Sequence, residues 1–175
     1  PIISSEEILL TAYSNIKSNR GSMTPGSQGQ TADETSMEKI KTLAMQLKTG
    51  TYKFPDVRRT WVPKPIKGID WSKKENLVKY GRPLGMPDFN AKIVQEAIRM
   101  VLNAIFEPIF EDLNLSYGFR PKYGCHNPMQ DIQNQTQGMS FALEGDIKGA
   151  FNELDHEEFI QILSRRIQDK KFLQL

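Results

Sequence analysis

The feature that most constrains the fold is residues 91–107, with the sequence AKIVQEAIRMVLNAIFE. Its apolar side chains recur three and four residues apart, so in a helix they form one wide stripe along a single face. Such a stripe is buried against other elements, which makes this helix the expected centre of a hydrophobic core. The stripe consists of Ile93, Val94, Ala97, Ile98, Val101, Leu102 and Ile105.

Capping residues predict three further helices. Residues 4–18 carry apolar side chains on one stripe, and a second helix is expected to begin at Ser36 and to end at Gly50. Asp155 is expected to cap a third helix, with Glu158 at the capping-box position. Its inward side chains would be Phe159, Ile162, Leu163 and Ile167.

Segments rich in β-formers predict strands, so the expected fold class is α+β. Residues 57–62 and 78–86 are expected to pair antiparallel, separated by a basic insertion over 66–76. Residues 139–147 are expected to form another strand that runs into Asp146. Residues 19–31 contain three glycines and a proline with little apolar content, and therefore predict a loop.

The charge is unevenly distributed along the chain. The whole chain has a net charge of +2, but residues 41–82 hold eleven basic and three acidic side chains, a net charge of +8. Aromatic residues are interleaved with these cations, which is typical of a surface that binds phosphates and stacks on bases. A solvated basic face is the alternative, and charge alone leaves it open. The aromatic residues are Tyr52, Phe54, Trp61, Trp71 and Tyr80.

Composition excludes several classes of protein. No apolar run approaches the ~20 residues that cross a bilayer, and the acidic start lacks the pattern of a secretory signal, so no membrane partner is expected. A single cysteine, Cys125, cannot form an internal disulfide, which favours a reducing compartment and leaves an organelle open. His126 and His156 are too few for a structural zinc site.

The segment EGDIKGAF, residues 144–151, carries the most informative carboxylate. An aspartate at the end of a strand, followed by the small residues Gly149 and Ala150 and the aromatic Phe151, suits a divalent cation held beside a triphosphate. Taken alone, an aspartate at the end of a strand is more often a turn former or a helix cap than a metal ligand. Lys64 between two prolines and Arg82 after a glycine are rigidly mounted cations, although either is also compatible with an ordinary surface charge.

Five segments occur in a fixed order, and together they resemble the group II intron-encoded reverse transcriptases and maturases over about residues 18–175. No single segment is specific, but the order of all five is. They read RGSMTPG, LKTGTYKFPDVRRTWVPK, GRPLGMPDFNAKIVQEAIRMVLNAIFEPIFE, SYGFRPKYGCH and EGDIKGAFNELDHE.

The resemblance implies a polymerase right-hand fold, with an N-terminal extension and fingers over residues 1–138 and the first part of the palm over residues 139–175. It implies RNA-directed DNA synthesis together with assistance to intron splicing and mobility. The implied partners are a group II intron RNA, a DNA target or primer and deoxynucleoside triphosphates, with a homodimer left open. The implied location is intracellular, in a bacterial cytoplasm or a mitochondrion or other organelle.

The resemblance also implies roles for individual residues. Asp146 and the Ile147 carbonyl would bind Mg²⁺ in a two-metal site, with Asp146 catalytic. Lys64 and Arg82 would face the triphosphate of the incoming nucleotide, and Ala150 and Phe151 would line its sugar. The expected RNA-binding residues are Arg20, Lys53, Arg58, Arg59, Lys67, Lys73, Lys74, Lys79, Arg120 and Lys122.

Some features depart from the family pattern. Asn152 and Gln28 stand where the family often has acidic residues, and residues 66–79 are longer than the usual hairpin. The Tyr-x-Asp-Asp block, which supplies the other metal-binding carboxylates, does not occur in these 175 residues. We therefore expect a fragment that is inactive alone. A maturase that only binds RNA and a related bacterial reverse transcriptase, of a retron or a diversity-generating element, remain as alternatives.

Overall fold

The computed structural model describes residues 2–113, 115–151 and 153–175. Asn152, one of the departures from the family pattern, lies outside the described residues. The chain forms two compact units, one of Pro1–Val101 with Leu175 and one of Leu102–Gln174. The predicted division between residues 138 and 139 stays a prediction.

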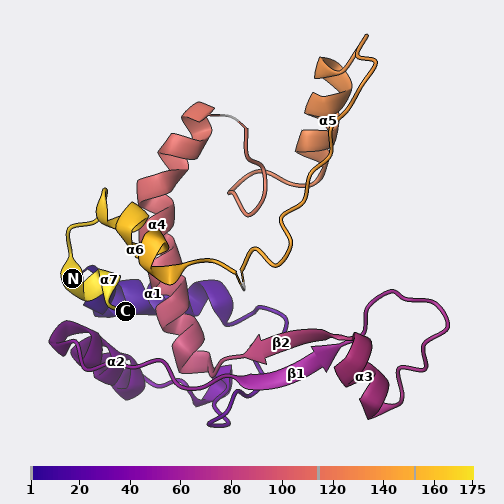
Figure 1. The fold of residues 1–175 in the computed structure, drawn as a ribbon. Helices are drawn as coiled ribbons and strands as arrows, with labels where there is room; N and C mark the ends of the chain where they lie inside the picture. The colour runs from indigo at the N-terminus through magenta and orange to yellow at the C-terminus, as the bar shows by residue number, and fades with distance from the viewer. Residues whose placement is uncertain (1, 114, 152) are drawn as a thin grey trace. The chain divides into compact units, whose positions relative to one another are not determined.

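Two helices and a short 3-10 helix form one side of the first unit (Figure 1). Helix α1, Glu6–Ile16, packs against α2, Met37–Thr49, and both contact η1, Ile2–Ser4. As predicted, Ser36 caps α2, because its hydroxyl accepts a hydrogen bond from the Lys39 amide at 3.3 Å. Gly50 ends α2 at a φ of +75°, a conformation that glycine adopts without strain.

Helix α4, Phe89–Leu113, supplies the centre of the core in the first unit. Phe89, Ile93, Val94 and Ala97 are buried there, as the sequence predicts for the last three. The helix begins before the predicted segment and continues beyond it through Pro108. Side chains of the other helices complete this core, among them Leu9, Ala12, Ile40, Leu43 and Leu47.

A polar cluster joins α1 to the first part of α4. Asn15 Nδ2 donates to Glu96 Oε1 at 3.0 Å, and Arg99 donates to both Glu96 oxygens at 2.6 and 2.7 Å. Hydrogen bonding from Arg99 lowers the pKa of Glu96 and, with the bond from Asn15, outweighs the opposing effect of burial. A buried carboxylate is thereby stabilised in its charged form between the two helices.

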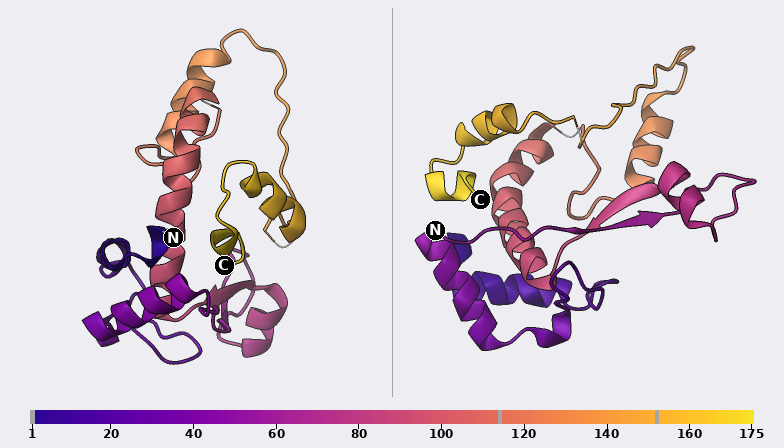
Figure 2. Two further views of the ribbon diagram at one scale, coloured as in Figure 1. Left: turned by 90° about the vertical axis from the view of Figure 1, so that its left-hand side faces the viewer. Right: turned by 60° about the horizontal axis from the view of Figure 1, so that its bottom comes forward.

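A two-stranded antiparallel ribbon extends from this core (Figures 1 and 2). Strand β1, Arg58–Val62, pairs with β2, Arg82–Met86, so that Arg58 is opposite Met86 and Val62 is opposite Arg82. The strand predicted over 57–62 is confirmed. The strand predicted over 78–86 is wrong in its first half, because Lys74–Tyr80 forms helix α3.

The segment before α3 explains this difference. Asp70 Oδ1 accepts hydrogen bonds from the Ser72 amide at 3.1 Å and from its hydroxyl at 2.6 Å, which closes a tight turn. Asn76 Nδ2 donates to the Asp70 carbonyl at 2.9 Å and ties the first turn of α3 to that turn. Local side-chain to backbone bonds therefore favour a helix where β-propensity had predicted a strand.

Asp88, directly before α4, fixes the loop of residues 20–31, which we call the glycine loop. This aspartate is fully buried, and its carboxylate accepts hydrogen bonds from the Gln28 amide at 2.9 Å, the Gln30 amide at 3.1 Å and the Ser27 hydroxyl at 3.1 Å. A Cβ at Gly26 would lie 2.4 Å from the Asp88 nitrogen. Only glycine allows the loop to approach this closely.

Among the described residues, the second unit contains three further helices, and a long connection separates the first of them from the second. Helix α5 is His126–Gln135, α6 is His156–Ser164 and α7 is Lys170–Leu173, and α6 contacts α7. Asp155 caps α6 as predicted, accepting from the Glu157 and Glu158 amides at 2.9 and 3.1 Å.

Two expectations for the second unit are wrong. Residues 139–147 do not form a strand, since a strand requires a hydrogen-bonded neighbour and no described segment pairs with them. The side chains of Phe159 and Ile162 are 41% and 53% exposed instead of buried, although Ile167 is buried.

The two units together are α+β, which confirms the predicted class in its coarse form. Within the described ranges, no helix is both long and apolar enough to span a bilayer.

Replacing Asp88 with alanine is expected to lower the free energy of unfolding by about 1–3 kcal/mol, because buried donors of the glycine loop lose their acceptor. Hydrogen exchange at the Gln28 and Gln30 amides should become faster. Asp33→Ala is the control, since Asp33 is exposed on the short 3-10 helix Ala32–Glu34. Equal stability and equal exchange in the two variants would contradict a structural role for Asp88.

Because the pKa of Asp88 is lowered in the folded protein, we expect the free energy of unfolding to depend on pH. Burial alone raises the pKa of Asp88, but the hydrogen bonds from Gln28, Gln30, Ser27 and Gly26 together lower it. A lowered folded-state pKa contributes stability above the unfolded value near ~3.9, and this contribution is lost as the pH falls through the folded value. Acid titration of unfolding should therefore show a steeper loss below about pH 4 in the wild type than in Asp88→Asn.

Candidate nucleic-acid interface

The most basic surface is formed by residues 58–86, which comprise β1, α3, β2 and the loop between β1 and α3, and which we call the basic ribbon. It holds eight basic and two acidic side chains. Because side chains alternate along paired strands, Arg58, Val62 and Arg82 share one face, whereas Arg59 and Trp61 lie on the other. Cations therefore occupy both faces of the ribbon.

Lys64 and Arg82 are brought to the same end of the ribbon. Arg82 is opposite Val62, and Lys64 follows Val62 by two residues; both cations are exposed. Gly81 allows this placement, because a Cβ there would lie 2.3 Å from the Leu77 carbonyl oxygen and 3.2 Å from that of Val62. The backbone before Arg82 thus packs directly against the end of α3.

The remaining cations of the ribbon lie on or beside α3. Lys67, Lys73, Lys74 and Lys79 are all exposed. Lys73 forms a long ion pair of 4.0 Å with Asp70, a surface interaction of small energetic value. Lys79 Nζ lies 5.0 Å from the centre of the Tyr80 ring. Exposed cations beside an aromatic ring can contact both the phosphates and the bases of a nucleic acid.

Three expected RNA-binding residues lie outside the ribbon and are exposed, namely Arg20, Lys53 and Lys122. Arg20 lines a hollow of about 240 Å³ between the glycine loop and Lys92, whose Nζ donates to the Gly21 carbonyl at 3.2 Å. Lys53 lines a larger pocket of about 430 Å³, together with Gln46 and Tyr52. Lys122 adopts a φ of +67° in the loop before α5.

Arg120 requires a correction, because its guanidinium is already bound within the protein. The residue is buried, its Nε and Nη2 donate to Glu107 Oε1 at 3.0 and 2.9 Å, and its Nη1 donates to the Ser116 carbonyl at 2.7 Å. Its guanidinium also lies 4.4 Å from the centre of the Tyr123 ring. Hydrogen bonding to Glu107 raises the pKa of Arg120. Arg120 therefore organises its loop and is not available to RNA.

Asp146 lies in the second unit and is exposed, as are Ile147, Ala150 and Phe151. Gly149, three residues after Asp146, turns the chain with a φ of +65°. Asp146 does not end a strand as predicted, because residues 139–147 pair with no described segment. Among the described residues, no group of three or more His, Cys, Asp or Glu side chains could hold a metal ion. Asp146 thus offers one carboxylate to a cation.

Sequence reasoning missed two features of this interface. Asp88 reads as an ordinary helix cap, since it precedes α4, and nothing local shows that its side chain binds a distant loop. The pocket around Tyr52 has no sequence signal either, because its walls come from four separate segments. Sequence reasoning also assigned no secondary structure to the residues of α5. In the structure this helix is joined to the preceding loop, because the Tyr117 hydroxyl donates a hydrogen bond to Asp131 Oδ2.

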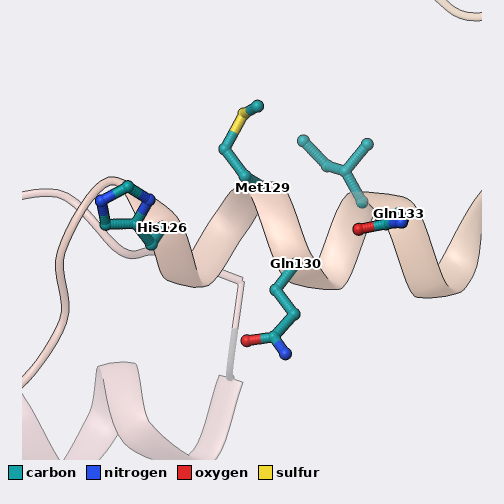
Figure 3. A pocket seen from close by; sticks show the side chains of 5 residues that line it. His126, Met129, Gln130 and Gln133 are labelled. Atoms are coloured by element: carbon teal, nitrogen blue, oxygen red, sulfur yellow. The ribbon is translucent and has the colours of Figure 1, made fainter.

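A hollow of about 570 Å³ on α5 is formed by that helix alone (Figure 3). His126, Met129, Gln130 and Gln133 lie along it, and the side chains of Met129 and Ile132 are 68% and 57% exposed. No second element provides an opposing wall among the described residues. We therefore regard it as an exposed face and not as a binding site.

Comparison with known proteins gives a consistent set of relatives, although no protein-family model matches the chain. The chain is 41% identical over 97% of its length to the group II intron-encoded protein LtrA of Lactococcus lactis subsp. cremoris. The chain belongs to the group II intron-encoded proteins. Two further relatives are an uncharacterized 91 kDa protein in the cob intron of Schizosaccharomyces pombe, 36% identical over 97% of the chain, and the putative COX1/OXI3 intron 1 protein of Saccharomyces cerevisiae, 34% identical over 99%.

The similarity to group II intron-encoded proteins covers both structural units, and it confirms the resemblance seen in the sequence. The chain spans 26% of the length of LtrA and 19% of each of the two yeast relatives.

Replacing Gly81 with alanine is expected to displace Arg82 and to lower the free energy of unfolding by about 1–3 kcal/mol, because the new Cβ overlaps the Leu77 carbonyl. RNA affinity should fall with it. Urea titration and RNA-binding titration measure the two effects. Gly118→Ala is the control, since a Cβ there meets no atom within 4 Å. If Gly81→Ala matches the wild type in both measurements, the close approach has no consequence for the ribbon.

Proposed function

We propose that the full-length protein is an RNA-directed DNA polymerase that also assists the splicing and mobility of a group II intron. In this proposal the present chain supplies the RNA-binding fingers and the beginning of the palm. The observation that carries the proposal is the basic ribbon: it exposes cations on both faces, within a chain that is 41% identical to a group II intron-encoded protein.

The ribbon is proposed to bind phosphates of the intron RNA and of the primer and template. Phosphate contacts by lysine and arginine release counterions and give affinity that does not depend on sequence. Lys64 and Arg82, at one end of the ribbon, are proposed to contact the triphosphate of an incoming deoxynucleotide. The exposure of both cations and the rigid mounting of Arg82 behind Gly81 support this role.

Asp146 is proposed as the catalytic aspartate, with Ile147 supplying its carbonyl oxygen and with Ala150 and Phe151 lining the nucleotide sugar. Carboxylate and carbonyl oxygens are the ligands that Mg²⁺ takes. These oxygens fit the metal, but the described residues supply only part of a two-metal site, and we propose that its other ligands come from the rest of the protein. When bound, Mg²⁺ would stabilise charge on the oxygens of the phosphoryl group.

The segment before Asp146 supports the proposal of an incomplete palm. Phe141, Leu143 and Ile147 are 94%, 102% and 78% exposed, and in a β-strand they would fall on one side because they are separated by even numbers of residues. An apolar side and unpaired backbone groups favour pairing with further strands. We propose that such strands belong to the part of the protein outside this chain.

The proposed partners are a group II intron RNA, a DNA target or primer and deoxynucleoside triphosphates, and a homodimer stays a proposal. The proposed location is a bacterial cytoplasm, a mitochondrion or another organelle, in keeping with the bacterial and yeast intron relatives. A maturase that has lost copying activity is the competing proposal, and the two experiments below separate it from the polymerase.

Asp146→Asn in the full-length protein is expected to reduce primer extension by at least about a hundredfold, because a metal ligand is worth several kcal/mol in the transition state. RNA affinity should not change, since the side chain is replaced without loss of a cation. Asp112→Asn is the matched control at another exposed aspartate. Undiminished extension by Asp146→Asn would refute the catalytic assignment.

Neutralising the adjacent pair Arg58 and Arg59 to glutamine is expected to weaken RNA binding and to reduce the dependence of log K on log salt concentration by about 0.7–0.9 per lost phosphate contact. The double change Arg165→Gln with Arg166→Gln removes the same charge from an exposed arginine pair at the end of α6. Titrations at several salt concentrations measure both slopes.

The results of these two experiments separate the proposals. Splicing that survives Asp146→Asn but falls with the ribbon variant, in a protein without primer extension, would favour a maturase that only binds RNA. An unchanged salt slope in the ribbon variant, or an equal loss in the Arg165 and Arg166 control, would contradict the proposed RNA-binding role of the ribbon.

A further inference from the structure

The basic ribbon is joined to the core of the first unit through its base, where β1 begins and β2 ends (Figures 1 and 2). Among the described residues, its strands contact each other and α3, and neither strand makes a contact of similar extent with α1, α2 or α4. A two-stranded ribbon is only marginally stable by itself. The direction of this ribbon therefore depends on the contacts that hold its base.

The register of the two strands shows what lies at that base. The last pair of the ladder is Arg58 with Met86, and two residues further the same register would place Asp56 opposite Asp88. The ladder does not reach that pair, and the glycine loop lies there instead. A Cβ on Gly26 would lie only 2.4 Å from the Asp88 nitrogen, so the loop backbone packs directly against the end of the ribbon.

Ser27 of the glycine loop contacts both ends of the ribbon. Its hydroxyl oxygen lies 2.5 Å from the carbonyl oxygen of Asp56, before β1, and 3.1 Å from Oδ2 of Asp88, after β2. The carbonyl and the carboxylate can only accept, and a hydroxyl has one hydrogen, so Ser27 shares that hydrogen between them. One side chain therefore joins the start of β1 to the end of β2. We call Ser27, Asp56 and Asp88 the clasp.

The clasp is attached to the core of the first unit. The Asp88 carboxylate also accepts hydrogen bonds from the Gln28 and Gln30 amides, which follow Ser27 in the loop. The loop is closed by the Ala32 amide, which donates to the Ser22 carbonyl at 3.2 Å, and Ala32 itself is buried. Ser27 is thus held at a fixed position beside the base of the ribbon.

The clasp lies at the opposite end of the ribbon from Lys64 and Arg82. Six residues separate Asp56 from Val62, the partner of Arg82, which at ~3.3 Å per residue corresponds to about 20 Å. A rotation of about 10° at the base would move the two cations by about 3–4 Å over this length. Charge-assisted hydrogen bonds to phosphate form at about 2.7–2.9 Å, so a displacement of this size breaks them.

We propose that Ser27 is a positioning residue for nucleotide binding. By holding the two ends of the basic ribbon together, it fixes the direction in which Lys64 and Arg82 meet the triphosphate of a deoxynucleotide. Ser27 does not touch the nucleotide and acts through the ribbon. This inference rests on the proposed polymerase function, and it adds the glycine loop to the parts of the protein that determine nucleotide affinity.

The test is primer extension by the full-length protein over a series of deoxynucleotide concentrations. Ser27→Ala is expected to raise KM for the deoxynucleotide about three- to tenfold, the effect of one hydrogen bond. The value of kcat should change less, because contacts with the triphosphate hold the nucleotide both before and during the reaction. Ser27→Thr should restore the wild-type KM, since it keeps the hydroxyl and Ser27 is exposed, which leaves room for a methyl group.

Ser36→Ala is the matched control. The Ser36 hydroxyl also makes one hydrogen bond, at the cap of α2, so both alanine variants lose a similar contribution to stability. Only Ser27→Ala should raise KM. A double change tests the route: in an Arg82→Gln background, Ser27→Ala should raise KM by a smaller factor than in the wild type, because a cation that it positions is absent.

The possible results separate this inference from the proposed function. An unchanged KM in Ser27→Ala, or an equal rise in Ser36→Ala, would overturn the inference and leave the polymerase proposal standing. The same conclusion follows if Ser27→Ala raises KM by the same factor with and without Arg82. If the wild type extends no primer, the polymerase proposal fails and the inference fails with it.

Discussion

Asp88 is a charge removed from water, and the energetic need to compensate it organises the first unit. A buried carboxylate is tolerated only where donors surround it, and here the donors are amides and a hydroxyl of the glycine loop. Glycine-rich segments lose much conformational entropy on ordering, so this loop needs a strong anchor. The same carboxylate holds Gln28 and Gln30 beside the pocket that Tyr52 lines, and it joins the loop to the start of α4.

The charges of the basic ribbon, unlike that of Asp88, are exposed to water. A two-stranded ribbon buries little apolar surface and is marginal alone, so its cations are held by backbone geometry at Gly81 and by α3. These cations remain in water and contribute little to folding. Arg120 shows that residue type does not decide such a role: its guanidinium is buried against Glu107 and stabilises a loop.

The second unit combines well-capped helices with exposed apolar side chains. Asp155 and Asp169 cap their helices through local hydrogen bonds, which need no other part of the protein. Phe141, Leu143 and Phe151 remain more than four-fifths exposed. The chain spans 26% of the length of LtrA, and the proposal of an incomplete palm accounts for these exposed side chains.

The sequence by itself determined α2, with its Ser36 and Gly50 caps, most of α4, strand β1 and the family, because periodicity, capping and motif order are local properties. Only the tertiary structure decided that Asp88 binds a loop about sixty residues away, that Tyr52 faces a pocket, and that Arg120 is buried. It also decided that residues 139–147 stay unpaired. Each of these depends on contacts between segments far apart in the chain, which no local pattern records.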